Sequence, residues 1–93
     1  MKINPGIRLT VLLLQSQGFT SIDSGDKYVN MTCIPEALSL ECKRLNSLLL
    51  MMGIKTEAMT ENNDVPTIQG YYDPYTSLAT ISLYNVDDKL LKL

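Results

Sequence analysis

The chain of 93 residues has no histidine and no tryptophan, and these absences exclude several kinds of catalytic and metal site. Without histidine, no imidazole can activate a serine or cysteine nucleophile, and the commonest zinc ligand is missing. The two cysteines, Cys33 and Cys42, provide no metal-binding spacing. The sequence contains neither the G-x-x-x-x-G-K-[ST] phosphate loop nor the G-x-G-x-x-G dinucleotide motif. We therefore expect a protein that is not an enzyme and that uses no cofactor or metal.

Long apolar runs are also missing, since no stretch approaches the roughly 20 residues that a membrane helix needs. The run Thr10–Leu14 follows Arg8 and is too short for the apolar region of a signal peptide. We expect no membrane association and a cytoplasmic location, in the host cell if the protein is phage-encoded. In that reducing compartment the two cysteines are expected to remain buried, unpaired thiols.

Basic residues are absent from the segment 56–88, which carries six acidic side chains. Residues 1–55 carry six basic and four acidic side chains, and the last five residues add Lys89 and Lys92. An acidic C-terminal half repels phosphate backbones, so we do not expect sequence-independent binding to nucleic acid.

The length predicts a single domain, 1–93, with a modest core, because a domain of this size buries only about 60–65% of its unfolded surface. The apolar fraction of 45% is that of an ordered globular protein. A small chain with this much apolar surface gains from burying part of it between copies, so we expect a homo-oligomer.

Two segments combine helical periodicity with marked ends. In the first, Asn4 can cap the helix, Pro5 occupies its first position and Gly18 ends it. The second begins at Pro35 and ends before Gly53. Their core-facing positions are expected to be Ile7, Val11, Leu12 and Leu14 in the first, and Leu38, Cys42, Leu45, Leu49 and Met52 in the second.

Alternating segments between turns predict the strands, at 19–22, 27–34, 54–59, 65–72 and 78–86. Pro66 places its strand at an edge or a bulge of the sheet. The last strand should turn Ala79, Ile81 and Leu83 to the core, and Leu78, Thr80, Ser82 and Tyr84 to the other face. The predicted fold is an α+β two-layer sandwich, with two helices packed on one face of a mainly antiparallel sheet of four to five strands.

The segment "DSGDK", Asp23–Lys27, is the first candidate site. Ser24 and the N–H groups around Gly25 and Asp26 could hold a phosphate, with Lys27 countering its charge. The alternative is a turn selected for its backbone geometry. Whether Asp23 and Asp26 meet a metal stays open, although two ligands are a weak signal.

The second candidate is the aromatic turn formed by Tyr71, Tyr72, Asp73 and Tyr75. Tyrosines offer a large, stiff contact area with a polar tip, are enriched at binding hot spots, and stack on bases. Strand alternation should direct one of Tyr71 and Tyr72 into the core, leaving the other and Tyr75 for binding.

A third candidate is the pair Lys43 and Arg44 on the second helix. Together with Lys27 it could form a small basic spot, and the alternative is a pair of solvated charges on a helix face.

The order of these features resembles that of small, mostly uncharacterised phage-encoded α+β accessory proteins. The matching residues are Gly18-Phe19 at the end of the first helix, "DSGD" at Asp23–Asp26, and the turn Tyr72-Asp73-Pro74. The chain departs from this pattern at Lys27, where a further glycine is expected. The resemblance implies a phage accessory protein, in the size range of inhibitors of host defence, and no reaction.

Two hypotheses about function follow. The first is a non-catalytic binding protein that sequesters a small nucleotide-type signal, with Ser24–Lys27 on the phosphate and the tyrosines on the base. The alternative is an inhibitor of a host protein, acting through the acidic, tyrosine-rich C-terminal hairpin. A structural role in a virion or in its assembly also remains open.

Overall fold

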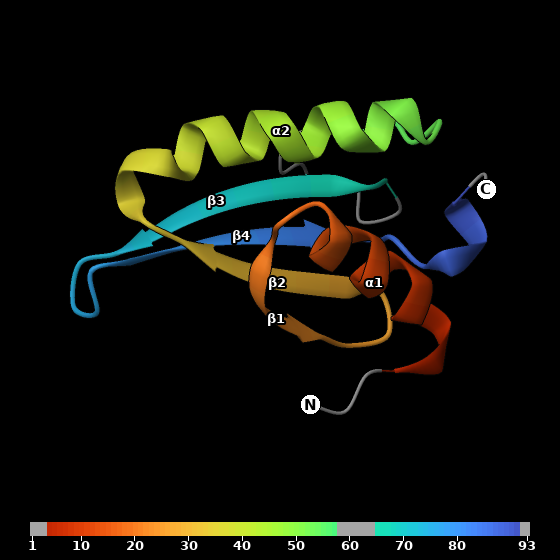
Figure 1. The fold of residues 1–93 in the computed structure, drawn as a ribbon, viewed down its shortest axis with the longest axis horizontal. Helices are drawn as coiled ribbons and strands as arrows, with labels where there is room; N and C mark the ends of the chain where they lie inside the picture. The colour runs from red at the N-terminus through yellow and green to blue at the C-terminus, as the bar shows by residue number, and fades with distance from the viewer. Residues whose placement is uncertain (1–3, 58–64, 92–93) are drawn as a thin grey trace.

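A computed structural model describes residues 4–57 and 65–91 of the chain. Its elements follow one another as helix, two strands, helix and two strands, one strand fewer after the second helix than predicted, with short 3-10 turns (η) at three places (Figure 1). They are η1 (Pro5–Ile7), α1 (Arg8–Ser16), β1 (Thr20–Ser24), β2 (Tyr28–Cys33), η2 (Pro35–Ala37), α2 (Leu38–Met51), β3 (Thr67–Asp73), β4 (Leu78–Tyr84) and η3 (Asp88–Leu90).

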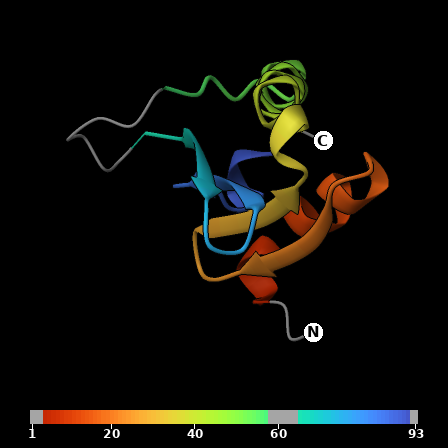
Figure 2. The same ribbon diagram turned by 90° about the vertical axis from the view of Figure 1, so that its left-hand side faces the viewer.

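The four strands form one antiparallel sheet in the order β1-β2-β4-β3. Both helices cover the same face of this sheet, and the other face is left open (Figures 1 and 2). The α+β two-layer fold is therefore confirmed, with four strands. Within the described residues, no helix combines the length and the apolar content that crossing a membrane requires.

The core lies between the helices and the sheet. Strand alternation is confirmed in β4, where Ala79, Ile81 and Leu83 are buried towards the helices. They pack with side chains of both helices and of β2 in one cluster that includes Ile7, Val11, Leu14, Val29, Met31, Leu45 and Leu49.

The first helical segment, η1 followed by α1, begins and ends much as its sequence predicts. The Asn4 side chain accepts a hydrogen bond from the Gly6 N–H, and Gly18 adopts a φ of +89° at the C-terminal end. The expectation for Leu12 was wrong, because its side chain is 45% exposed. Val11 and Leu14 are the apolar side chains of α1 that are buried against the sheet, so the buried face of this helix is narrower than predicted.

The first turn of α1 is capped from the far end of the chain. The Asp88 carboxylate accepts hydrogen bonds from the Leu9 N–H at 3.0 Å, from the Thr10 N–H at 2.8 Å and from the Thr10 hydroxyl at 2.9 Å. A carboxylate at this position satisfies N–H groups that have no partner within the helix. Asp88 thereby fastens η3 to the start of α1.

The strand predicted at 54–59 is not formed in its described part. Ile54–Thr56 have no regular structure, and Glu57 makes a single parallel bridge with Thr67, while residues 58 and 59 lie outside the described residues. The reason is tertiary, since Ile54 is buried in the core while its backbone N–H donates to the Leu49 carbonyl in the closing turn of α2.

Cys33 and Cys42 are both free, half-buried thiols. Burial raises the pKa of each thiol above its usual value, and the negative charge of Glu41 adds to the effect. The folded state therefore holds the thiol protons more tightly than the unfolded chain does, and this stabilises it below the unfolded-state pKa of about 8.5. The contribution is lost as the pH rises through the raised folded-state values.

We predict that iodoacetamide alkylates both thiols several-fold more slowly than it alkylates a free cysteine at pH 8, because the thiolate fraction is small. Mass spectrometry of a time course measures the rates, and a Cys42→Ala variant isolates Cys33. Rates equal to those of the urea-unfolded chain would contradict this prediction.

Candidate binding surface

The three tyrosines of the aromatic turn all lie on the surface. Tyr71 is 59% exposed, Tyr72 is 47% exposed and Tyr75 is 96% exposed. The expectation that one of Tyr71 and Tyr72 fills the core was wrong. Tyr72 does lie on the helix side of the sheet, but Leu38 at the start of α2 packs over Gly70, and the hairpin extends past the helix (Figure 1).

Two further apolar side chains are exposed beside these tyrosines, and the sequence analysis did not single them out as site residues. Leu78 pairs with Asp73 across the hairpin, and Ile34 directly follows Cys33, which pairs with Ala79. Both side chains are at least half exposed. We call the five residues Ile34, Tyr71, Tyr72, Tyr75 and Leu78 the aromatic end. The sequence gives one signal for these two residues, which is that each adjoins a turn. Ile34 precedes Pro35, and Leu78 follows Ser77.

Asp73 builds the turn that presents Tyr75. Its Oδ1 accepts a hydrogen bond from the Tyr75 N–H at 2.9 Å, and its carbonyl accepts one from the Ser77 N–H at 2.9 Å. Ser77 takes a φ of +58°, which closes the loop back into β4. Asp73 therefore serves the shape of the hairpin, and its carboxylate gives this end of the molecule a negative charge.

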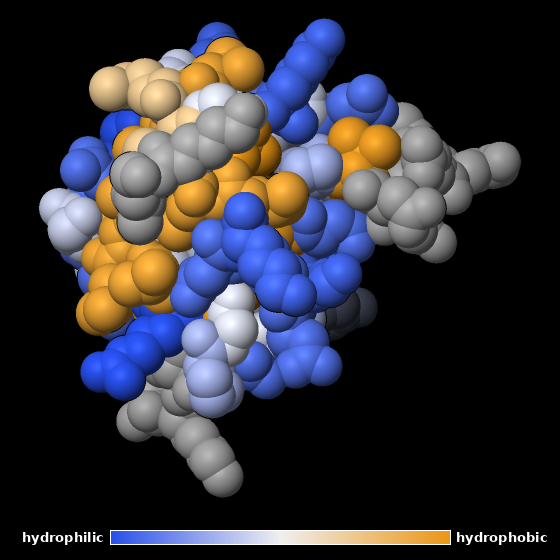
Figure 3. Space-filling model, turned by 90° about the vertical axis from the view of Figure 1, so that its right-hand side faces the viewer, coloured by the Kyte–Doolittle hydropathy of each residue, from blue (hydrophilic) through white to orange (hydrophobic). Residues whose placement is uncertain are grey.

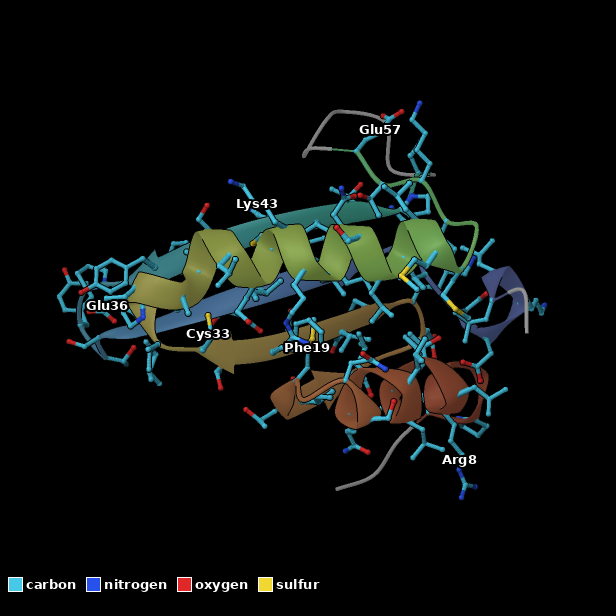
Figure 4. The ribbon with its side chains drawn as sticks, turned by 45° about the horizontal axis from the view of Figure 1, so that its top comes forward. Arg8, Phe19, Cys33, Glu36, Lys43 and Glu57 are labelled. Carbon is cyan, nitrogen blue, oxygen red and sulfur yellow. The ribbon has the colours of Figure 1, made fainter. Side chains whose placement is uncertain are left out.

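The surroundings of the aromatic end are acidic. Between Thr67 and Tyr84, Asp73 is the only charged residue of the two strands and their turn. Exposed Glu36, in η2, lies at the same end of the molecule (Figure 4). The aromatic end thus combines stiff aromatic surface with negative charge.

The "DSGDK" segment uses its polar groups to hold the fold together. The Gly25 N–H donates to the Tyr28 carbonyl, and the ring of Tyr28 lies so close over Gly25 that a Cβ there would be 2.1 Å from it. Asp26 accepts a hydrogen bond from the Asn4 side chain, which ties this turn to the start of the chain's first helical segment. The Ser24 hydroxyl is buried and without a hydrogen-bond partner among the described residues. The Gly25 N–H is thus engaged within the fold and the Ser24 hydroxyl is buried, so neither is available to a phosphate at the surface.

Two side chains of this segment face hollows, Asp23 on the open face of the sheet and Lys27 beside the end of β4. The hollow at Lys27 has a volume of about 270 Å³ and is also lined by Asn85, Asp87, Lys89 and Leu90. The Lys27 carbonyl accepts from the Asn85 N–H at 2.7 Å, so the main chain here is also engaged.

The two predicted groups of ligand-binding residues lie at opposite ends of the sheet. In β2, Tyr28 at the "DSGDK" end pairs with Tyr84, and Cys33 at the hairpin end pairs with Ala79. At about 3.3 Å per residue, the strand holds the two ends roughly 17 Å apart before the loops are counted. One copy of the chain therefore does not bring Ser24–Lys27 and Tyr71–Tyr75 onto one small ligand.

Arg44 does not form a free basic spot with Lys43. Its guanidinium makes an ion pair with Glu41 at 2.7 Å, donates to the Gln17 carbonyl, and lies 4.1 Å from the centre of the Phe19 ring. The hydrogen bond to Glu41 raises the pKa of Arg44. These contacts join α2 to the end of α1, while the Lys43 side chain is exposed on the helix (Figure 4).

The open face of the sheet is hollowed between its edge strands. The hollow has a volume of about 550 Å³ and is lined by Asp23, Asn30, Thr32, Gln69, Tyr71, Thr80, Ser82 and Tyr84. At its floor, Ser82 is only 8% exposed and donates to Asn30 Oδ1 at 2.7 Å. Asp23 is the only charged lining residue, so this hollow favours neutral polar groups over phosphates.

A second apolar surface lies at the other end of the molecule, where α1, the C-terminal end of α2 and η3 come together (Figure 3). Its exposed large side chains include Leu9, Met51 and Leu90, and none of these is aromatic. Aromatic residues concentrate binding energy in protein interfaces. Among the described residues, three of the four exposed ones lie at the hairpin end, and Tyr28 lies at the opposite end of the sheet.

Within residues 4–57 and 65–91, no three cysteine or carboxylate side chains gather in a way that could hold a metal ion. Comparisons with protein-family models, with curated protein sequences and with solved structures found no match to this chain.

Proposed function

We propose that the protein is a non-catalytic binding protein that contacts a protein partner through the aromatic end. One observation carries this proposal, namely the exposure of three tyrosines and Leu78 on a hairpin that extends past the helices, with exposed Ile34 at the adjoining end of β2 (Figure 1). Isolated exposed apolar residues are normal on a protein surface, but a group of this kind is typical of an interface.

The charge around the aromatic end indicates a basic partner surface. Asp73 and Glu36 supply negative charge, and tyrosine rings attract arginine and lysine side chains through their π-electrons. A surface of the partner that is rich in arginine or lysine fits both features. Such contact would cover a basic functional site on the partner, as expected of an inhibitor of a host protein.

Sequestration of a nucleotide requires that one small ligand reach both Lys27 and the tyrosines, whereas binding to a protein needs only the aromatic end. Lys27 and the tyrosines lie at opposite ends of the sheet, so a phosphate on one and a base on the other would need two copies of the chain. The phage origin implied by the sequence resemblance, and its role against host defence, stay predictions.

We predict that a photo-crosslinking residue at position 75 captures one protein partner from host cells, because Tyr75 lies at the tip of the aromatic end. The matched control is the same residue at Tyr28, at the opposite end of the sheet. After purification of the captured partner, Tyr75→Ala combined with Leu78→Ser should weaken its binding about tenfold or more.

Two results would overturn the proposal. One is a partner that is captured equally from positions 75 and 28 and that binds the double variant unchanged. The other is a rise in melting temperature with a cyclic or linear nucleotide that Lys27→Ala abolishes, since that result supports sequestration instead.

A further inference from the structure

The free edge of the sheet at β3 carries main-chain groups that are not engaged among the described residues (Figure 2). At the start of this edge, the Glu57 N–H donates to the Pro66 carbonyl, and the Glu57 carbonyl accepts from the Ile68 N–H. Because main-chain groups alternate in direction along a strand, those of Gly70 and Tyr72 also point away from β4. Within the described part of the chain, these two N–H and two C=O groups have no main-chain partner.

The opposite edge, β1, is protected in ways that β3 is not. Its pairing with β2 shifts between Thr20 and Asp23, and such an irregularity, with a charged residue beside it, hinders the addition of another strand. By contrast, β3 pairs with β4 at seven consecutive positions without a shift, and its segment 70–72 has no charged residue. A regularly paired, uncharged edge is a template for a further strand.

We propose that this further strand is β3 of a second copy of the chain, in antiparallel orientation. The two four-stranded sheets then join into one sheet of eight strands about a two-fold axis. In the register that we infer, Gly70 of each copy lies opposite Tyr72 of the other. Each of these two pairs exchanges two main-chain hydrogen bonds, so the four bonds use every free group of both segments.

The features at the ends of the open segment select this register. Glu57 already lies beside Thr67, so a second strand cannot continue past that position. A register shifted towards Thr67 would place the second copy on Glu57. A shift in the opposite direction sets Gly70 against Pro74, which has no N–H to donate. In the proposed register the second copy turns away at its own Pro74, where its hairpin leads back to β4.

The side chains are compatible with this pairing. Tyr71 lies on the two-fold axis, on the open face, so the Tyr71 residues of the two copies form a cross-strand aromatic pair. Tyr72 lies on the helix side opposite Gly70 of the second copy, which has no side chain to compete for space. Like-charge repulsion is small, because the paired segment carries no charge.

In the dimer, both copies of the chain would contribute residues to the surface around the open-face hollow. Tyr71 lines the open-face hollow, so the two hollows meet at the Tyr71 pair and each is completed by a residue of the other copy. The two hairpin tips, with Tyr75 and Leu78, point in opposite directions and remain exposed. The protein would therefore present two hairpin tips to partners, while Tyr71 and Tyr72 of each aromatic end would contribute to the dimer seam. The dimer itself does not depend on the identity of a partner.

Sedimentation velocity over a range of concentrations tests the proposal. We expect the wild-type mass to rise from 10.4 kDa towards twice that value. Tyr72→Pro removes the outward N–H while leaving the bonds between β3 and β4 intact, and should weaken association about tenfold or more. The matched control Tyr72→Phe keeps the N–H and should associate as the wild type does.

Hydrogen exchange on the unmodified protein provides a second test that does not depend on the folding of a variant. On passing from dilute to concentrated protein, the amides of Gly70 and Tyr72 should gain protection, and the amides of β1 should not. A mass of 10.4 kDa at every concentration would overturn the proposal. A dimer in which the Gly70 and Tyr72 amides exchange as fast as in the monomer would overturn it as well.

Discussion

Replacing Asp88 with alanine is expected to lower the free energy of unfolding by about 3 kcal/mol, since three hydrogen bonds to a charged group are lost at once. The Thr10 hydroxyl is buried and would be left without its partner, as would the N–H groups of Leu9 and Thr10. A domain of this length has a total stability of about 5–14 kcal/mol, so the loss is a large fraction of it.

Urea unfolding followed by circular dichroism measures this effect, and a fall in the melting temperature of about 12–24 °C is expected with it. Asp87→Ala is the matched control, because the Asp87 carboxylate accepts one hydrogen bond among the described residues, from the Lys89 N–H at 3.0 Å. That control should cost about 1 kcal/mol or less. An Asp88→Ala variant no less stable than the Asp87→Ala variant would disprove the capping role.

Replacing Gly70 with valine should destabilise the fold by about 2–3 kcal/mol, because the new side chain overpacks the interface between β3 and α2. A Cβ at this position would lie 3.2 Å from both Cys42 Sγ and Leu38 Cδ1, and the valine methyl groups would come closer still. The helix must then move away from the sheet, at the expense of buried contacts made by Leu45 and Leu49.

A double-mutant cycle with Leu38→Ala separates this cause from a general effect of altering β3. If overpacking is the cause, the smaller side chain at position 38 makes room, and the double variant is about 1 kcal/mol more stable than the sum of the single effects predicts. Gln69→Val, in the same strand but facing the open side, serves as the control and should be nearly neutral. Additive effects at positions 38 and 70 would count against this explanation.

The sequence predicts the fold well because its signals are local and repeated. Asn4, Pro5, Gly18 and Gly53 mark helix ends through their own backbone chemistry, and the structure uses Asn4, Gly18 and Gly53 as predicted. Pro66 was expected near a sheet edge, and β3 is an edge strand. The predicted strand at 54–59 failed where Ile54 is drawn into the turn after α2, which is a tertiary requirement.

The candidate site was predictable only in part. The tyrosines and the turn at Asp73 could be named from composition and turn chemistry. Their exposure could not, because that of Tyr72 depends on how far α2 reaches along the sheet, and that of Tyr71 on both helices lying on the other face. Ile34 and Leu78 join the aromatic end only through the pairing of β2 with β4, which brings together positions more than 40 residues apart.

The sequence by itself determined the two helices, the antiparallel strands, the inward and outward faces of β4 and the uneven charge, since each depends on near neighbours in the chain. The tertiary structure alone decided that Asp88 caps a helix 78 residues away, and that "DSGDK" and the tyrosines lie at opposite ends of the sheet. It also decided which edge of the sheet stays open. The physical reason is that strand order and helix placement follow from burying one shared core, and no local pattern records which distant segments that core brings together.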